Sequence, residues 1–315
     1  MSRATDMRIL RHAAAPAGTA IAIGSFDGVH LGHAAILERV RTEAATRGLA
    51  SGAVTFEPLP REFFRPNEAP PRLSSLAERL ADFARLGLDA AFVERFDARF
   101  AALTADDFER RIASRYGAHW VMVGEDFRYG ARRQGDVERL ARAGRQWGFE
   151  VHAHPAVVAG GERVSSTAVR EALALGDLDH AARLLGRPYA ICGRVVHGAK
   201  RGRGMGFPTA NVRLARRKPA LTGIFAVKCE GAATRGLEGV ASLGMNPAVA
   251  QNGPATLEAF LFDFQGDLYG RRLSIEFLKK LRDEAPFASL DDLVAQIRRD
   301  CDTAREFFRA AGATR

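Results

Sequence analysis

The first half of the chain alternates between short apolar runs and stretches with helical spacing. Residues 19–23 form an apolar run typical of a buried parallel strand, and residues 53–56 form a second one. Between them, apolar residues recur every three or four positions, and Gly48 is placed to end a helix. The pattern predicts a strand–helix–strand unit.

The same alternation continues toward residue 186. Further strands are expected at 90–93, 120–123 and 149–152, and helices at 73–86 and at 105–116 behind Thr104. Strands that alternate with helices in this way predict an α/β domain, in which helices cover both faces of a parallel sheet.

Beyond residues 184–189 the pattern changes to short β runs separated by glycine turns. These runs are 190–196, 223–228, 240–243, 256–264 and 272–278. Their spacing predicts a small antiparallel β-barrel, followed by an amphipathic helix over 290–308. We therefore expect two domains, 1–186 and 187–315.

Composition narrows the class of protein. The 315 residues are 47% hydrophobic and 26% charged, as in soluble globular proteins. No apolar stretch reaches the length of a membrane span or of a secretory signal core, so we expect a cytoplasmic protein without a membrane partner. Its three cysteines are widely spaced and predict neither a disulfide framework nor a zinc site.

The net charge of +9 raises the possibility of nucleic-acid binding. Only five of the 46 basic residues are lysines, and no basic run is interleaved with aromatic residues. Nucleotide substrates account for such a surface equally well, so we expect no nucleic-acid partner. The alternative predicts an affinity that falls steeply with salt.

The first candidate site is the segment 24–33, Gly-Ser-Phe-Asp-Gly-Val-His-Leu-Gly-His, between the first predicted strand and helix. A helix start offers free N–H groups and a positive dipole end, and His30 and His33 add two titratable donors. The segment therefore predicts a phosphate site. Two ordinary turn histidines are one alternative, and a zinc site is a weaker one, because no further cysteine or histidine lies nearby.

Two later segments carry similar chemistry. Residues 124–130 follow a predicted strand, although a plain surface turn is an alternative. At 163–170, Ser165, Ser166 and Thr167 can cap a helix, with Ser166 at the cap and Arg170 one turn inward, where a guanidinium fork suits phosphate. An ordinary cap beside a solvent-exposed arginine is the alternative.

Taken in order, the segments 24–33, 55–64, 124–130 and 163–170 resemble the amino-terminal half of the bacterial bifunctional riboflavin kinase and FAD synthetase family. The resemblance implies a Rossmann-like nucleotidyltransferase domain that adenylylates FMN with ATP. It implies catalytic roles for His30, His33 and Arg170. The ATP-binding residues that it implies are Gly24, Phe26, Asp27, His30, His33, Asp126, Ser166, Thr167 and Arg170. Leu59 departs from the family pattern, which usually has histidine there.

The second candidate site lies at 198–211, where glycines and basic residues precede Pro-Thr-Ala-Asn. It is not a Walker A loop, because no Gly-Lys-Ser/Thr sequence or helical pattern follows. In an extended segment, Thr209 and Asn211 project to the same side. Their oxygens are ligands of the kind that Mg²⁺ takes beside nucleotide phosphates.

This segment resembles the riboflavin kinase motif of the same family, which implies that Glu258 is the general base and that Thr209 and Asn211 hold Mg²⁺. The ATP- or flavin-binding residues that it implies are Gly198, Lys200, Gly204, Gly206, Pro208, Thr209 and Asn211. A paired glutamate on the solvent face of the barrel is the alternative for Glu258. Phe260 departs from the family pattern, which often has histidine there.

The whole resemblance implies a bifunctional enzyme that phosphorylates riboflavin to FMN and then adenylylates FMN to FAD, with ATP, riboflavin and FMN as substrates and Mg²⁺ as cofactor. The alternative is a protein with one working half, whose other half only binds flavin or nucleotide. The sequence carries no signal for an oligomeric state.

Overall fold

The computed structural model describes residues 7–11, 13, 15, 18–198, 206–216, 218–231, 234–245 and 255–313. The chain divides into two compact units. The first unit comprises Met1–Pro70 and Leu76–Ser165, and the second comprises Pro71–Ser75 and Ser166–Arg315. The domain boundary expected at residue 186 stays a prediction.

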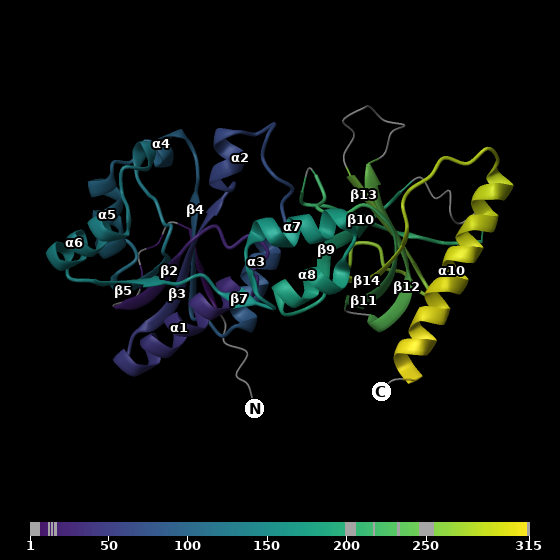
Figure 1. Ribbon diagram of the computed structural model, residues 1–315, viewed down its shortest axis with the longest axis horizontal. Coiled ribbons are helices and arrows are strands. Elements are labelled where there is room, and N and C mark those ends of the chain that lie inside the picture. Colours follow the sequence, from purple (N-terminus) through teal and green to yellow (C-terminus); the bar gives the residue numbers. More distant parts are fainter. Residues whose placement is uncertain are drawn as a thin grey trace. The chain divides into compact units, whose positions relative to one another are not determined.

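The first unit contains a parallel six-stranded sheet in the order β1-β4-β3-β2-β5-β6 (Figure 1). Its strands are β1 (Arg8–Leu10), β2 (Thr19–Ile23), β3 (Ala50–Glu57), β4 (Ala90–Arg95), β5 (Ala118–Gly124) and β6 (Glu150–His154). All five residues of β2 are buried, as expected of a strand covered on both faces. The predicted parallel sheet is therefore confirmed.

Helices cover both faces of this sheet (Figure 1). The main ones are α1 (Leu31–Arg47), α3 (Leu76–Arg85), α5 (Ala105–Ser114) and α6 (Val137–Trp147). Leu37 of α1 and Phe83 of α3 pack in the core on one face, while Phe108 of α5 and Leu140 of α6 pack in the core on the other. Each core excludes water from its face of the sheet.

Local signals in the sequence place the ends of these helices. Gly48 has φ +65° and ends α1 with its N–H directed at the last carbonyls, as predicted. Thr104 begins α5, where its hydroxyl accepts a hydrogen bond from the N–H of Asp107. Asp136 begins α6 in a similar way, because its carboxylate accepts a hydrogen bond from the N–H of Arg139. Shorter elements complete the unit: α2 (Pro60–Phe64), α4 (Ala98–Ala101), η1 (Ala131–Arg133), β7 (Val158–Ala159) and β8 (Glu162–Arg163).

The second unit is built on a closed antiparallel barrel in the order β10-β13-β12-β11-β14-β9. Its strands are β9 (Tyr189–Val196), β10 (Ala210–Arg213), β11 (Gly223–Gly231), β12 (Thr234–Met245), β13 (Ala255–Leu261) and β14 (Arg272–Arg282). The same unit contains α7 (Ser166–Leu175), α8 (Leu178–Leu185) and the terminal helix α10 (Leu290–Ala313). Both the barrel and the terminal helix are as predicted.

Alternation along β13 separates the inside of the barrel from its outside. Leu257, Ala259 and Leu261 are buried, whereas the residues between them are partly exposed. On the outside, Cys301, Ala304 and Phe308 of α10 form a second core with side chains of the barrel. One barrel face is therefore covered by α10.

We expect Leu37→Ala to destabilise the first unit by about 2–5 kcal/mol, because Leu37 is fully buried and the substitution leaves a cavity beneath α1. Val158→Ala, at a 62% exposed position, should change the free energy of unfolding by less than about 0.5 kcal/mol. Both tryptophans, Trp120 and Trp147, lie in this unit, so denaturation followed by tryptophan fluorescence reports on it. An equal loss of unfolding free energy in Leu37→Ala and Val158→Ala would contradict the buried packing of Leu37.

Candidate functional site

The first candidate site lies at the carboxyl edge of the parallel sheet. From β2 the chain adds strands on one side, β3 and then β4, and later places β5 on the other side of β2. Loops leaving such a switch point diverge and form the usual ligand crevice of an open α/β sheet. Residues 24–30 leave β2 here, and residues 124–130 follow β5.

The turn after β2 has an unusual backbone. Phe26 has φ +50° and Val29 has φ +40°, on either side of Gly28 at +87°. Left-handed conformations at a bulky or β-branched residue are uncommon. Two of the three left-handed positions in this turn are therefore taken by residues other than glycine. The N–H of Val29 closes the turn on the carbonyl of Phe26 at 3.2 Å.

The two histidines stack at the start of α1. His30 is the N-cap residue, and its Nδ1 accepts a hydrogen bond from the N–H of His33 at 3.3 Å. The two rings lie 3.7 Å apart and nearly parallel. Gly32 makes room for this arrangement, because a Cβ there would lie 3.2 Å from the His30 ring. The structure thus brings together the two histidines that the sequence singled out.

The ring of His33 is held in its neutral form. Burial, the neighbouring His30 and the positive charge of Arg79 together lower the pKa of His33 well below its usual value of 6.5. Its Nδ1 is buried and makes no hydrogen bond with the part of the chain that the structure describes. The ring of Phe26 meets it edge to face at 5.2 Å.

The other residues predicted for this site have separate surroundings. Gly24 directly follows β2, and Asp27 is buried within the same turn. Asp126 is exposed and lies 3.4 Å from the guanidinium of Arg163. Leu59, where the family pattern has histidine, is buried at the start of α2, and its N–H donates to Glu62 Oε2 at 3.0 Å.

Ser166, Thr167 and Arg170 lie on α7, in the second unit. The helix begins at Ser166, so Ser166 occupies its first turn and the cap position expected for it falls at Ser165. The guanidinium of Arg170 donates to the carbonyl of Pro71 at 2.7 Å and to that of Ser166 at 3.0 Å. A joint role with the histidines stays a prediction.

Arg79, a fully buried arginine on α3, was not among the residues predicted from the sequence. Its side chain lies beneath the turn after β2, where its guanidinium donates to the carbonyl of Ser25 at 2.9 Å. An arginine in an amphipathic helix ordinarily faces solvent. The spacing of Arg79 from Leu76 and Phe83 places it on the apolar face of α3, but its partners lie at strand ends distant in the sequence.

The second candidate site lies on the outer face of the barrel. The ladder between β10 and β13 pairs Asn211 with Glu258. The hydroxyl of Thr209 donates to Glu258 Oε2 at 3.1 Å. The three residues predicted to act together in this unit are therefore neighbours.

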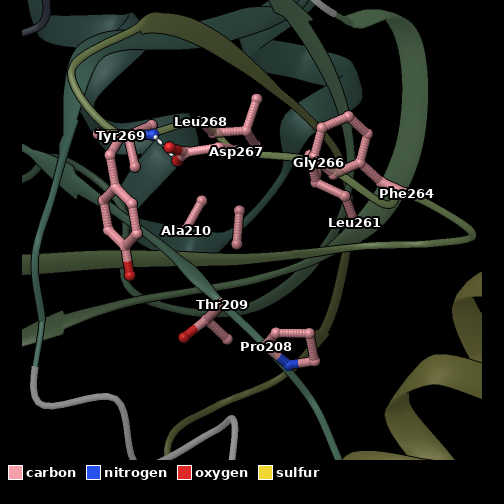
Figure 2. A pocket seen from close by; sticks show the side chains of 11 residues that line it. Pro208, Thr209, Ala210, Leu261, Phe264, Gly266, Asp267, Leu268 and Tyr269 are labelled. Carbon is pink, nitrogen blue, oxygen red and sulfur yellow. Dashed lines mark hydrogen bonds between the residues drawn. The ribbon is translucent and has the colours of Figure 1, made fainter.

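A pocket of about 300 Å³ adjoins this group. Figure 2 shows Pro208 and Thr209 on one side of it, Asp267 and Tyr269 on another, and Leu261 with Phe264 on a third. Between β13 and β14, the carboxylate of Asp267 accepts a hydrogen bond from the N–H of Tyr269 at 2.8 Å. The pocket offers a planar ring an apolar wall beside polar groups.

The glycine-rich segment is described only at its ends. Lys200 and Gly204, both predicted to bind ATP or flavin, lie outside the described residues. Gly198 contacts Asn211 so closely that a Cβ there would lie 2.4 Å from the Asn211 amide group. Gly206 has φ +84°, which favours glycine.

Phe260, the second departure from the family pattern, takes part in packing. Its ring meets that of Phe207 edge to face at 5.4 Å and that of Phe262 at 5.9 Å. Phe262 in turn contacts the core beneath α10. An aromatic contact thus holds the segment before Thr209 against β13.

Known protein families match the two parts of the chain separately. A family model described as FAD synthetase matches residues 12–168, and one described as riboflavin kinase matches residues 185–308. A bifunctional riboflavin kinase/FMN adenylyltransferase from Escherichia coli K12 is 47% identical over 92% of this chain and 93% of its own length. The chain belongs to this family. A relative of the same name from Haemophilus influenzae is 41% identical over 93% of this chain and 95% of its own length.

The fold of the whole chain has a solved counterpart. A crystal structure titled macrolide-efflux protein from Streptococcus pneumoniae matches with a TM-score of 0.78 and 30% identity, covering 95% of this chain and 98% of its own. In the described part of this family member, no helix is long and apolar enough to cross a membrane.

We expect Gly198→Ala to lower the rate of FMN formation by about 10-fold or more, because the added methyl group displaces the Asn211 amide. Gly312→Ala is the control, since a Cβ there meets no atom within 4 Å. Chromatography of riboflavin and FMN over time measures both variants. An unchanged rate of FMN formation in Gly198→Ala would show that the kinase reaction does not depend on the position of the Asn211 amide.

Proposed function

We propose that the second unit phosphorylates riboflavin with ATP, giving FMN and ADP, and that FMN is then adenylylated with a second ATP, giving FAD and pyrophosphate. The single observation that carries the kinase assignment is the contact of Thr209 and Glu258 beside the 300 Å³ pocket. For the second reaction it is the stacked pair of histidines at the start of α1. The two family matches support one reaction for each part of the chain.

In the kinase reaction, Glu258 would accept the proton of the ribityl 5′-hydroxyl as its oxygen attacks the γ-phosphorus of ATP. The hydroxyl of Thr209 donates to one carboxylate oxygen of Glu258 and so fixes the orientation of the carboxylate. The pocket lined by Val195, Leu261 and Phe264 would hold a ring of the substrate. Phosphoryl transfer depends mainly on such positioning.

The residues at this site fit a magnesium ion that arrives with ATP. Thr209 and Asn211 offer neutral oxygen donors next to the Glu258 carboxylate, and hard oxygen ligands are those Mg²⁺ prefers. Among the described residues, no three His, Cys, Asp or Glu side chains are grouped to hold a metal. This fits an ion whose other ligands are phosphate oxygens and water. When bound, Mg²⁺ would neutralise charge on the transferred phosphoryl group.

In the adenylyl transfer, a phosphate oxygen of FMN would attack the α-phosphorus of ATP, and pyrophosphate would leave. The N-terminus of α1 and the histidine pair offer preorganised donors for the charge that develops. Because Nδ1 of His33 is buried and finds no hydrogen-bond partner among the described residues, we assign the donor role to its Nε2. Ser166, Thr167 and Arg170 are proposed to bind the phosphates as well, and Asp126 to line the nucleotide site. We place both reactions in the cytoplasm.

The first test is a time course with riboflavin, ATP and Mg²⁺, in which chromatography separates riboflavin, FMN and FAD. FMN that rises and then gives way to FAD is the expected result. FMN alone would mean that only the kinase works. The absence of both products would overturn the proposal, and nucleic-acid affinity that falls steeply with salt would then support the nucleic-acid alternative.

Two substitutions assign each reaction to its residues. Glu258→Gln should slow FMN formation by about 10²–10⁴-fold, because the general base is lost, and should leave the conversion of added FMN intact. His33→Ala should slow FAD formation by about 10²–10³-fold and leave FMN formation intact. Each variant is the control for the other. Loss of both activities in either variant would contradict the assignment.

A further inference from the structure

Arg79 is a fully buried arginine that none of the roles proposed above uses. Moving a guanidinium out of water is costly unless hydrogen bonds and an opposite charge compensate. Here Glu57 supplies the charge, with its Oε2 2.6 Å from Nη2 of Arg79. Glu57 ends β3, so the ion pair joins α3 to the carboxyl end of that strand.

Further hydrogen bonds join Arg79 to two segments of the chain. Its guanidinium donates to the carbonyl of Ser25 at 2.9 Å and to that of Phe56 at 3.2 Å. It also donates to the hydroxyl of Thr55 at 2.8 Å, and that hydroxyl in turn donates to the same Ser25 carbonyl at 3.2 Å. Arg79 therefore connects the turn after β2 to the end of β3.

The carbonyl of Ser25 belongs to the peptide that leads into Phe26. Holding this carbonyl fixes the orientation of that peptide, next to a residue whose φ of +50° is uncommon for a bulky side chain. One helical turn further along α3, Phe83 meets the Phe26 ring edge to face at 5.4 Å. The opposite contact of Phe26 is with the ring of His33. Two residues of α3 thus support the turn, one through its backbone and one through its aromatic ring.

Arg79 also acts on His33 through its charge. It is one of three causes that lower the pKa of His33, after burial and His30. A positive neighbour disfavours the protonated ring. The same side chain therefore bears on both the geometry and the charge state of the histidine pair.

We propose that Arg79 is a positioning residue for adenylyl transfer, which holds the 24–33 turn against the end of β3 so that its donors are preformed for the ATP phosphates. This inference rests on the proposed adenylyltransferase function. The hydrogen bonds of Arg79 described above lie within the first unit, so we expect its substitution to leave the kinase reaction unchanged.

The test compares Arg79→Met and Arg79→Lys with Arg85→Met. Arg85 lies on the same helix, but its side chain is 58% exposed and pairs only with Asp82 among the contacts described. Each purified chain is assayed for FAD formation from added FMN and for FMN formation from riboflavin, and tryptophan fluorescence reports on the folding of the first unit. We expect Arg79→Met to lower kcat/KM for FAD formation by about 100-fold, with FMN formation and Arg85→Met unchanged.

The pH profile separates positioning from general loss of structure. Without the charge of Arg79, the pKa of His33 rises, so the ring becomes protonated at a higher pH. The acid limb of the FAD-forming activity should therefore move to higher pH in Arg79→Met. Arg79→Lys keeps the charge, so its acid limb should stay at the wild-type position and its rate should be partly restored.

Thr55→Val tests the same turn and leaves the charge of Arg79 unchanged. It removes the hydroxyl that bridges Arg79 and Ser25, so the rate of FAD formation should fall while the acid limb stays in place. FAD formation within about twofold of Arg85→Met in both Arg79→Met and Thr55→Val would overturn the inference. If Arg79→Met does not fold, the result for Thr55→Val decides. A wild-type chain that forms no FAD would instead overturn the proposed function.

Discussion

The hydrogen-bond register between β10 and β13 is the constraint on which the kinase site depends. This register pairs Asn211 with Glu258 and leaves Thr209 within hydrogen-bond distance of the same carboxylate. Side chains alternate along a strand, so a slip by one residue would turn Glu258 into the barrel and Ala259 out of it. The buried alternation of Leu257, Ala259 and Leu261 opposes such a slip. The core of the barrel therefore protects the chemistry on its outer face.

The first unit positions its candidate site by a different route. There the loops that leave the carboxyl ends of β2 and β5 diverge, and the site is built from a turn rather than from a strand. A turn has no ladder to fix its register, so other groups must hold it. Arg79 and Phe83 do this from α3, one through the Ser25 carbonyl and the other through the Phe26 ring. In both units, therefore, buried side chains support the site: the inner residues of β13 in one, and Arg79 and Phe83 in the other.

Much of the fold could be predicted, because its signals are local. The apolar run of β2, the glycine that ends α1 and the threonine that begins α5 each act within a few residues. The histidine pair could be found for the same reason, since both members lie on one helical turn. Arg79 could not, because its burial arises from packing between α3 and strand ends distant in the sequence. The left-handed Phe26 is likewise imposed by tertiary contacts. The roles of Asp126, Ser166, Thr167 and Arg170 stay predictions.

Closure of the barrel has a consequence for association between chains. A closed sheet presents no unpaired strand, whereas the open sheet of the first unit ends at β1 and β6. An unpaired strand is a template to which another chain can add. β6 carries Glu150, His152 and His154 within five residues, and Glu150 is held by Arg47. Polar and ionic side chains of this kind disfavour strand addition at β6, whereas in the barrel the closure of the sheet itself leaves no edge to which a strand could add.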